Sequence, residues 1–280
     1  MRVKNMLVKQ RVKFWTVFCK LFDAQIKLML LYASEIWGTS RLSITESSHL
    51  FACKRLLGLS DKSPNHKRVY GETARYPLYT DSTISSLRYW LKLRRMPIIR
   101  ILKQVLIMLQ NSLDLGGKGK RKNWAGNIKE CFESQGFQDV WTQGRVNNEV
   151  AFLYSIGQKM VERFKLEWST KISDSDRFST YRIFRSVLQA EKYINDITIK
   201  KFRDIIIRLR LGIYELGVNK RFQPESVNKT CPLRSNVLED VFHLLFNCPV
   251  YADIRYKYLR QFIVHDVELS FNSLFKKCKY

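Results

Sequence analysis

Long apolar runs are missing from this sequence of 280 residues. No stretch of about 18 or more apolar residues without charges occurs, so we predict no transmembrane helix. The longest candidate, residues 28–37, is short and contains Glu35. No apolar run follows the basic residues 1–4, and we expect no signal peptide. The six cysteines are scattered, as is typical of reduced thiols, so we expect an intracellular protein, nuclear or cytoplasmic, that is not secreted.

Clustered acidic residues are also missing. Polymerases of the reverse-transcriptase type need closely placed carboxylates for two metal ions, and no Asp-Asp pair occurs here. A hydrolytic nuclease needs clustered acids with a histidine or basic partner. The four histidines form no paired motif: His49, His66, His243 and His265. No glycine-rich phosphate-binding loop of the Walker type occurs either. The sequence therefore predicts no catalytic residues.

Proline and glycine are scarce, with six and twelve residues respectively, which favours long helices. Hydrophobic residues make up 45% of the chain and aromatic residues 13%, which is enough for a core and argues against disorder. No alternating strand pattern of useful length is present, although a small strand pair is expected within 222–233. The sequence predicts a mainly α, multi-helix fold with a small irregular zinc-knuckle-like element near the C-terminus.

Apolar spacing places the expected helical segments along the whole chain. They cover residues 6–36, 43–57, 82–96, 124–134, 147–168, 178–189, 197–216, 238–246 and 250–264. Glycines and cations fill residues 116–123, so this stretch is the clearest linker. We therefore expect helical regions over 1–115 and 124–228 on either side of it, followed by a C-terminal element over 229–280. A nuclear-import signal is a second interpretation of the same basic stretch.

Positive charge dominates the composition, since 49 Lys and Arg residues face 25 Asp and Glu residues, for a formal net charge of +24. Such a surface attracts polyanions. Nucleic acid, as RNA, DNA or both, is the first partner that we expect, and an anionic membrane surface is the second. A basic protein with no such partner is the remaining alternative. Repulsion between like charges argues against self-association without a polyanion, but the oligomeric state stays open.

Helical spacing groups several of these cations on common faces. A stripe on the first predicted helix is either a phosphate contact or an ordinary solvated face. Residues 82–113 contain six basic residues and no acid, and three of the six lie on one face. The predicted nucleic-acid-binding residues are Lys9, Lys13, Lys20, Lys27, Arg88, Lys92, Arg95, Lys118, Lys120, Arg121, Lys122, Arg208 and Arg210.

Three residues near the C-terminus have the outline of a metal site: Cys231, His243 and Cys248. The four residues between His243 and Cys248 are a spacing seen in zinc sites. Cys231-Pro232-Leu233-Arg234 resembles a Cys-x-x-Cys knuckle with Arg234 at the fourth-ligand position, and a guanidinium cannot donate a lone pair. We expect weak or absent zinc binding, with a remote cysteine or a water completing the site. The alternative is a set of partly buried side chains without metal.

Six blocks, in collinear order, resemble the region downstream of the polymerase palm in non-LTR retrotransposon reverse transcriptases. The first, Leu-Leu-Tyr-Ala-Ser-Glu-Ile-Trp-Gly at 30–38, is similar to a Leu-Tyr-Gly-Ser-Glu-Ile-Trp-Gly stretch of that family. The last contains His243, Cys248 and Pro249, like the second half of the family's Cys-Cys-His-Cys knuckle. The blocks cover residues 30–38, 54–64, 69–78, 88–93, 201–220 and 239–251.

The resemblance implies a thumb-like and connector region over 1–115, a helical connector over 124–228 and a degenerate knuckle over 229–280. Such regions grip template and nascent duplex and bind element RNA or target DNA. The chain departs from the family pattern at Ala33, where glycine is common, and at Arg234, where a cysteine is. It departs again at Gly212 and Tyr214, where Ser and His are common.

The resemblance further implies the C-terminal, nucleic-acid-binding fragment of a retrotransposon RNA-directed DNA polymerase. Its catalytic palm and endonuclease are expected upstream of Met1, outside this sequence. Two alternatives remain. The chain is an inert remnant of a decayed element, or it is one piece of an active reverse transcriptase whose catalytic part is encoded in a separate upstream frame.

Overall fold

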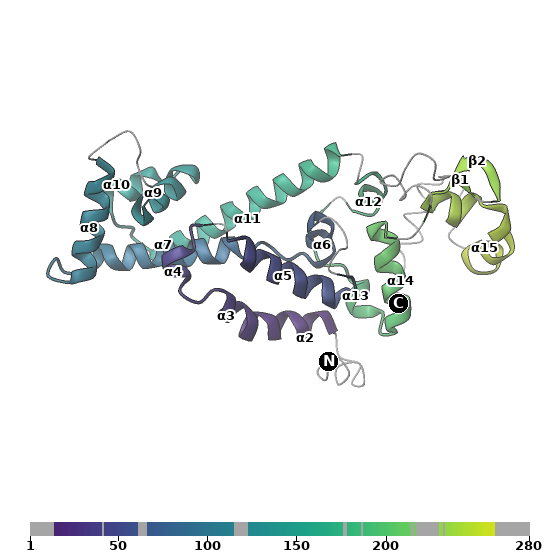
Figure 1. The fold of residues 1–280 in the computed structure, drawn as a ribbon, viewed down its shortest axis with the longest axis horizontal. Coiled ribbons are helices and arrows are strands. Elements are labelled where there is room, and N and C mark those ends of the chain that lie inside the picture. Colours follow the sequence, from purple (N-terminus) through teal and green to yellow (C-terminus); the bar gives the residue numbers. More distant parts are fainter. Residues whose placement is uncertain are drawn as a thin grey trace. The chain divides into compact units, whose positions relative to one another are not determined.

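A computed structural model describes residues 14–40, 42–60, 66–114, 123–175, 178–185, 187–213, 216, 230, 231 and 233–260. This part of the chain is mainly helical, as the sequence predicted (Figure 1). No helix within the described ranges is both long enough and apolar enough to span a membrane.

The chain divides into two compact units, and each unit is assembled from segments that are distant in the sequence. Unit 1 comprises Met1–Trp15, Lys54–Ala74 and Ser169–Tyr280, and unit 2 comprises Thr16–Cys53 and Arg75–Trp168. The elements from the N-terminus to the end of the long helix α11 are α2 (Phe14–Leu21), a π-helical turn (Phe22–Ile26), α3 (Lys27–Leu30), α4 (Ser34–Trp37), α5 (Ser43–Leu56), α6 (His66–Thr73), α7 (Tyr79–Arg95), α8 (Ile101–Asp114), α9 (Trp124–Ser134), α10 (Gln138–Gln143) and α11 (Glu149–Asp174).

The remaining elements all belong to unit 1. They are α12 (Ser179–Phe184), α13 (Tyr193–Asp196), α14 (Lys200–Leu211), β1 (Thr230–Cys231), β2 (Arg234–Leu238), a π-helical segment (His243–Asn247), a 3-10 turn (Pro249–Tyr251) and α15 (Ala252–Leu259). The strands form an antiparallel pair, in which β1 lies within the predicted range 222–233 and β2 follows that range. Residues 222–229 lie outside the described ranges.

The predicted long helix over 6–36 is interrupted in its described part. A π-helical turn separates α2 from α3, and Ala33 between α3 and α4 has a φ of 54°, in the left-handed region. This conformation places the alanine Cβ close to the backbone and is unfavourable for residues other than glycine. Ala33 is the position at which the resemblance predicted glycine, so its backbone explains that preference physically.

Helices α4 and α7 approach closely because small residues line their contact. A Cβ added to Gly38 would lie 2.0 Å from the carbonyl oxygen of Ser82, so only glycine fits at residue 38. The Ser82 hydroxyl donates a hydrogen bond to the Gly38 carbonyl at 2.9 Å, and the Ser86 hydroxyl donates one to the Ser34 carbonyl at 2.8 Å. The Ser-Glu-Ile-Trp-Gly block of the sequence is therefore a helix-packing element.

The core of unit 2 lies where α7, α8, α9 and α11 meet. Trp90 is fully buried there, stacked on Trp141 with ring centroids 5.5 Å apart and edge-on to Phe132 at 5.1 Å. Burial raises the pKa of the Cys131 thiol to about 11, so this thiol is protonated at neutral pH. The core residues are Leu87, Trp90, Leu91, Leu93, Leu106, Ile128, Cys131, Phe132, Leu153, Ile156 and Met160.

The stretch predicted as a linker, 116–123, joins two helices of the same unit. Residues 115–122 lie outside the described part, but the side chain of Asn123 forms hydrogen bonds with both α8 and α9. Its side-chain amide donates to the Leu109 carbonyl at 3.0 Å, and its side-chain oxygen caps α9 by accepting from the Gly126 amide at 2.8 Å. These hydrogen bonds join the start of α9 to α8 within unit 2.

A buried network of charged side chains fastens α6 to α14 in unit 1. Glu72 is fully buried on α6, and Arg210 of α14 donates to both of its carboxylate oxygens at 3.1–3.2 Å. The same guanidinium contacts Glu191 at 2.6 Å, and Glu191 also pairs with the buried Arg185. The Tyr193 hydroxyl donates to Glu72. Two arginines and two glutamates thus neutralise one another inside the unit.

Burial and coupling set the protonation of this network. Burial has the largest single effect on the pKa of Arg210 and lowers it, but Glu72, through its charge and its hydrogen bonds, acts together with Tyr193 and Glu191 to raise the pKa above its ordinary value. Burial, followed by the charge of Glu72, raises the pKa of Tyr193 well above its ordinary value, so its hydroxyl remains a donor. Removing one partner of such a network leaves an uncompensated charge in a water-poor site, which is strongly destabilising.

The substitution Arg210→Met is expected to lower the free energy of unfolding by about 3–5 kcal/mol, because Glu72 loses its principal counter-charge. The matched control is Arg208→Met, two residues away on the same helix but exposed, which is expected to change stability by less than about 0.5 kcal/mol. Urea unfolding followed by circular dichroism measures both. Equal effects of the two substitutions would contradict the assigned role of the network.

The substitution Ala33→Gly is expected to raise the free energy of unfolding by about 0.5–1 kcal/mol, because glycine adopts a positive φ without the alanine penalty. The control, Ala24→Gly, lies in the π-helical turn without a positive φ and is expected to lower stability by a similar amount. Thermal unfolding of both variants provides the test. A loss of stability in Ala33→Gly would show that residue 33 does not adopt the left-handed conformation.

Candidate functional site

The predicted phosphate-binding residues fall into three groups. Six lie outside the described residues: Lys9, Lys13, Lys118, Lys120, Arg121 and Lys122. Five of the others are exposed on helices, and one of these, Arg95, pairs with Glu149. The remaining two, Lys27 and Arg210, are less exposed and contact acidic side chains of their own unit. Solvent access therefore separates cations that the sequence could group only by their charge.

The predicted stripe on the first helix is not continuous where it can be followed. Lys20 is exposed on α2, but Lys27 on α3 forms an ion pair with Asp81 of α7, with Nζ and the carboxylate oxygen 2.7 Å apart. This pair engages one of the four predicted lysines. Of the two described lysines in the stripe, Lys20 is therefore the better placed to contact a phosphate.

Helix α7 carries the predicted basic face. Arg88, Lys92 and Arg95 are all exposed and follow one another at intervals of four and three residues, so they lie on one side of the helix. Arg95 contacts Glu149 at 3.0 Å, but its side chain remains 64% exposed. An exposed ion pair of this kind is weak, which leaves the Arg95 guanidinium able to exchange Glu149 for a phosphate.

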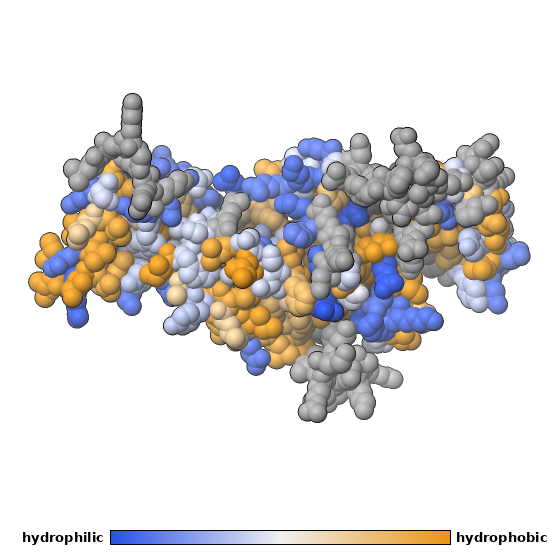
Figure 2. All heavy atoms as spheres, viewed as in Figure 1, coloured by the Kyte–Doolittle hydropathy of each residue, from blue (hydrophilic) through white to orange (hydrophobic). Residues whose placement is uncertain are grey.

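The basic segment 82–113 does not continue as a basic surface on α8. Figure 2 shows a hydrophobic surface over α8 and the turn before it. Large apolar side chains are exposed there: Ile98, Ile99, Ile101, Leu102, Val105 and Met108. The cations that this segment offers to a polyanion are therefore concentrated on α7.

Helix α14 separates two arginines that the sequence placed together. Arg208 is exposed, but Arg210 is only 4% exposed and is held by Glu72 and Glu191, so its predicted phosphate contact is wrong. Residues two apart on a helix point to nearly opposite sides, which explains the difference. Lys201, which the prediction missed, shares the exposed side with Arg208.

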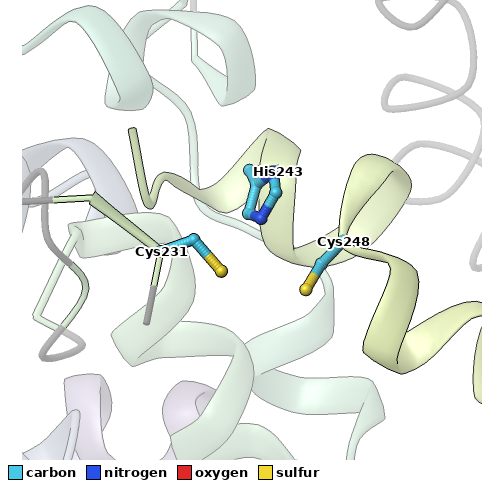
Figure 3. Close-up of side chains that lie close together, drawn as sticks. All are labelled: Cys231, His243 and Cys248. Carbon is cyan, nitrogen blue, oxygen red and sulfur yellow. The ribbon is translucent and has the colours of Figure 1, made fainter. Parts of the chain in front are cut away.

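The predicted metal ligands come together in the C-terminal part of unit 1. Cys231, His243 and Cys248 are all buried, and one potential ligand atom from each lies within 4.8 Å of the others. Figure 3 shows both sulfurs and a ring nitrogen pointing into the same space. The Nε2 atom of His243 has no hydrogen-bond partner among the described atoms. A buried ring nitrogen without a partner fits a metal ligand.

Local structure fixes the three ligands in place. Cys231 lies on β1, His243 begins the π-helical segment and Cys248 follows it. The Asp240 carboxylate accepts a hydrogen bond from the His243 amide at 2.7 Å, and the Cys248 amide donates to the His243 carbonyl at 2.6 Å. Val241 is buried against Leu209 and Leu216, so this segment packs on the end of α14.

The β1–β2 pair explains the position of Arg234. Its register places Arg234 opposite Cys231 across a two-residue turn. A residue in that position is a cross-strand neighbour of Cys231, as the second ligand of a knuckle would be. Arg234, at the position predicted to lack a metal ligand, therefore pairs with Cys231 across the two strands.

The cluster has the chemistry of a metal site with one ligand position open. Two thiolates and an imidazole suit zinc and similar ions. In a tetrahedral zinc site, bond lengths of about 2.3 Å place two sulfurs about 3.8 Å apart, so ligand atoms as much as 4.8 Å apart must move inward by about 1 Å. The arrangement is able to hold a metal ion through three protein ligands.

Sequence reasoning missed a further group of exposed residues on α15. Tyr256, Lys257 and Tyr258 are exposed on this helix and Arg260 just after it, in the segment that follows Cys248. The available signal was the alternation of tyrosine and lysine at 256–258 in a basic segment.

The chain was compared with known proteins at three levels. No family model, no curated protein and no solved structure matched it. The similarity to retrotransposon reverse transcriptases thus remains a prediction from the sequence blocks.

Proposed function

We propose that this chain binds nucleic acid as the C-terminal region of a non-LTR retrotransposon reverse transcriptase. The observation that carries the proposal is the buried cluster of Cys231, His243 and Cys248, three members of a knuckle, in a chain with a net charge of +24. The exposed cations Arg88 and Lys92 of α7 and Lys201 and Arg208 of α14 support it, whereas the buried Arg185 and Arg210 of unit 1 are paired with glutamates.

Binding would proceed through phosphate neutralisation. Each phosphate contacted by a lysine or arginine releases condensed counterions, so affinity falls as salt rises. Arg88 and Lys92 on α7, with Lys201 and Arg208 on α14, are the described side chains best placed for these contacts. Such contacts position the protein on a nucleic acid without reading its sequence.

Zinc is the metal that we propose for the knuckle, since the donors are two thiolates and one imidazole. Cys231, His243 and Cys248 would hold the ion, and its contribution would be structural, linking β1 to the segment before α15. Affinity would be low, because a structural zinc site uses four protein ligands and Arg234 cannot supply the fourth.

Affinity for a short duplex is expected to fall steeply when salt rises from about 50 to 200 mM. The double variant Lys201→Gln/Arg208→Gln is expected to reduce the slope of log K against log salt by up to about 1.8, which corresponds to two phosphate contacts. The control is Arg163→Gln, an exposed arginine already paired with Glu167 at 3.3 Å, which is expected to leave the slope unchanged. Fluorescence anisotropy measures each slope. Salt-independent binding of the unmodified chain would refute the proposed function.

Arg234→Cys is expected to raise zinc affinity at least about tenfold, by adding a thiolate next to Cys231, and to protect residues 229–250 from proteolysis. The control, Ser235→Cys, adds the same group one residue along β2, away from the position that pairs with Cys231. Competition with a chromophoric chelator measures the affinities. An equal gain in both variants, or tight stoichiometric zinc in the unmodified chain, would contradict the assignment of residue 234.

A further inference from the structure

Helix α15 exposes two tyrosine side chains in the segment that follows Cys248. It begins four residues after Cys248, following the single 3-10 turn Pro249–Tyr251. Arg255 is its buried residue, whereas Tyr256 and Tyr258 are 69% and 61% exposed. Two exposed tyrosines within three residues concentrate aromatic surface on this helix of eight residues.

A cation lies over each of these rings. The Lys257 Nζ is 5.2 Å from the centroid of the Tyr258 ring, and the Arg260 guanidinium carbon is 5.6 Å from that of Tyr256. Asp253 is the only acid of α15 and lies in its first turn, where it complements the helix dipole. The remainder of the exposed helix thus combines aromatic faces with positive charge.

This combination fits a particular ligand chemistry. An apolar protein groove that covered the rings would also have to bury Lys257 and Arg260 without counter-charges, which is costly. An unpaired nucleotide offers a base face for each ring and a phosphate for each cation. Bases in a duplex are stacked on one another, so their faces are not available to these tyrosines.

We propose that α15 is a stacking surface for single-stranded nucleic acid, with Tyr256 and Tyr258 contacting bases and Lys257 and Arg260 contacting phosphates. This inference rests on the proposed nucleic-acid-binding function and assigns it a preferred form of ligand. The two tyrosines lie on different sides of the helix, so they would contact bases that are not adjacent in the strand. RNA and single-stranded DNA share the chemistry that these residues recognise.

The test compares tyrosine variants of the full chain on three fluorescent ligands: an oligouridine, an oligothymidine and a DNA duplex, each about 12 nucleotides or base pairs long. The double variant Tyr256→Ala/Tyr258→Ala is expected to bind both single strands at least about fivefold more weakly, the smallest effect expected for loss of one stacked base. Duplex affinity is expected to change less than about twofold. The salt slope is expected to stay constant, because no charge is removed.

Two controls separate stacking from a general loss of surface. Tyr256→Phe/Tyr258→Phe keeps both rings and is expected to retain single-strand affinity. Tyr154→Ala removes a tyrosine that is 68% exposed on α11 and is expected to have no effect. Circular dichroism confirms that each variant is folded before it is assayed.

The outcomes distinguish this inference from the function on which it rests. If the unmodified chain binds all three ligands but the double alanine variant binds single strands equally well, the stacking surface is refuted and the proposed function stands. An equal loss on single strands and duplex also refutes stacking. If the unmodified chain binds none of the ligands at low salt, the proposed function fails and this inference fails with it.

Discussion

Two buried arginines of unit 1 are paired with glutamates, and this pairing holds α14 against α6. Arg210 and Arg185 lie inside the unit because Glu72 and Glu191 accompany them, and Tyr193 satisfies a further acceptor position on Glu72. The network joins α6 to α14 across a sequence separation of 138 residues. With one side of α14 fixed in this way, Lys201 and Arg208 lie on the side that faces solvent. Burial therefore decides which cations remain for a polyanion.

The same helix supports the C-terminal cluster. Val241 packs against Leu209, so the segment that carries His243 and Cys248 is attached to the end of α14. Under the proposed function, the metal ligands and the exposed cations both depend on the buried ion network for their positions. The network positions α14, α14 supports the knuckle, and the knuckle leads directly into α15.

The sequence predicted the helical class and the composition of the cluster, but only part of the detail. Apolar periodicity located α7, α11 and α14 to within a few residues, and spacing alone brought together Cys231, His243 and Cys248. It did not identify α8, whose apolar side chains are largely exposed. The break at Ala33 depends on a backbone angle that alanine rarely adopts, so no propensity rule indicates it. Arg208 and Arg210 looked alike because their difference lies in Glu72, which is distant in the sequence.

Photocrosslinking tests the central claim most directly, namely that the cations left exposed by the fold are those that contact nucleic acid. A 4-thiouridine oligonucleotide is crosslinked to the full chain near physiological salt, and the attached peptides are identified by mass spectrometry. The account predicts crosslinks in peptides from the exposed sides of α7, α14 and α15. Crosslinks confined to other segments would contradict it, and so would an absence of crosslinks under conditions in which the oligonucleotide is bound.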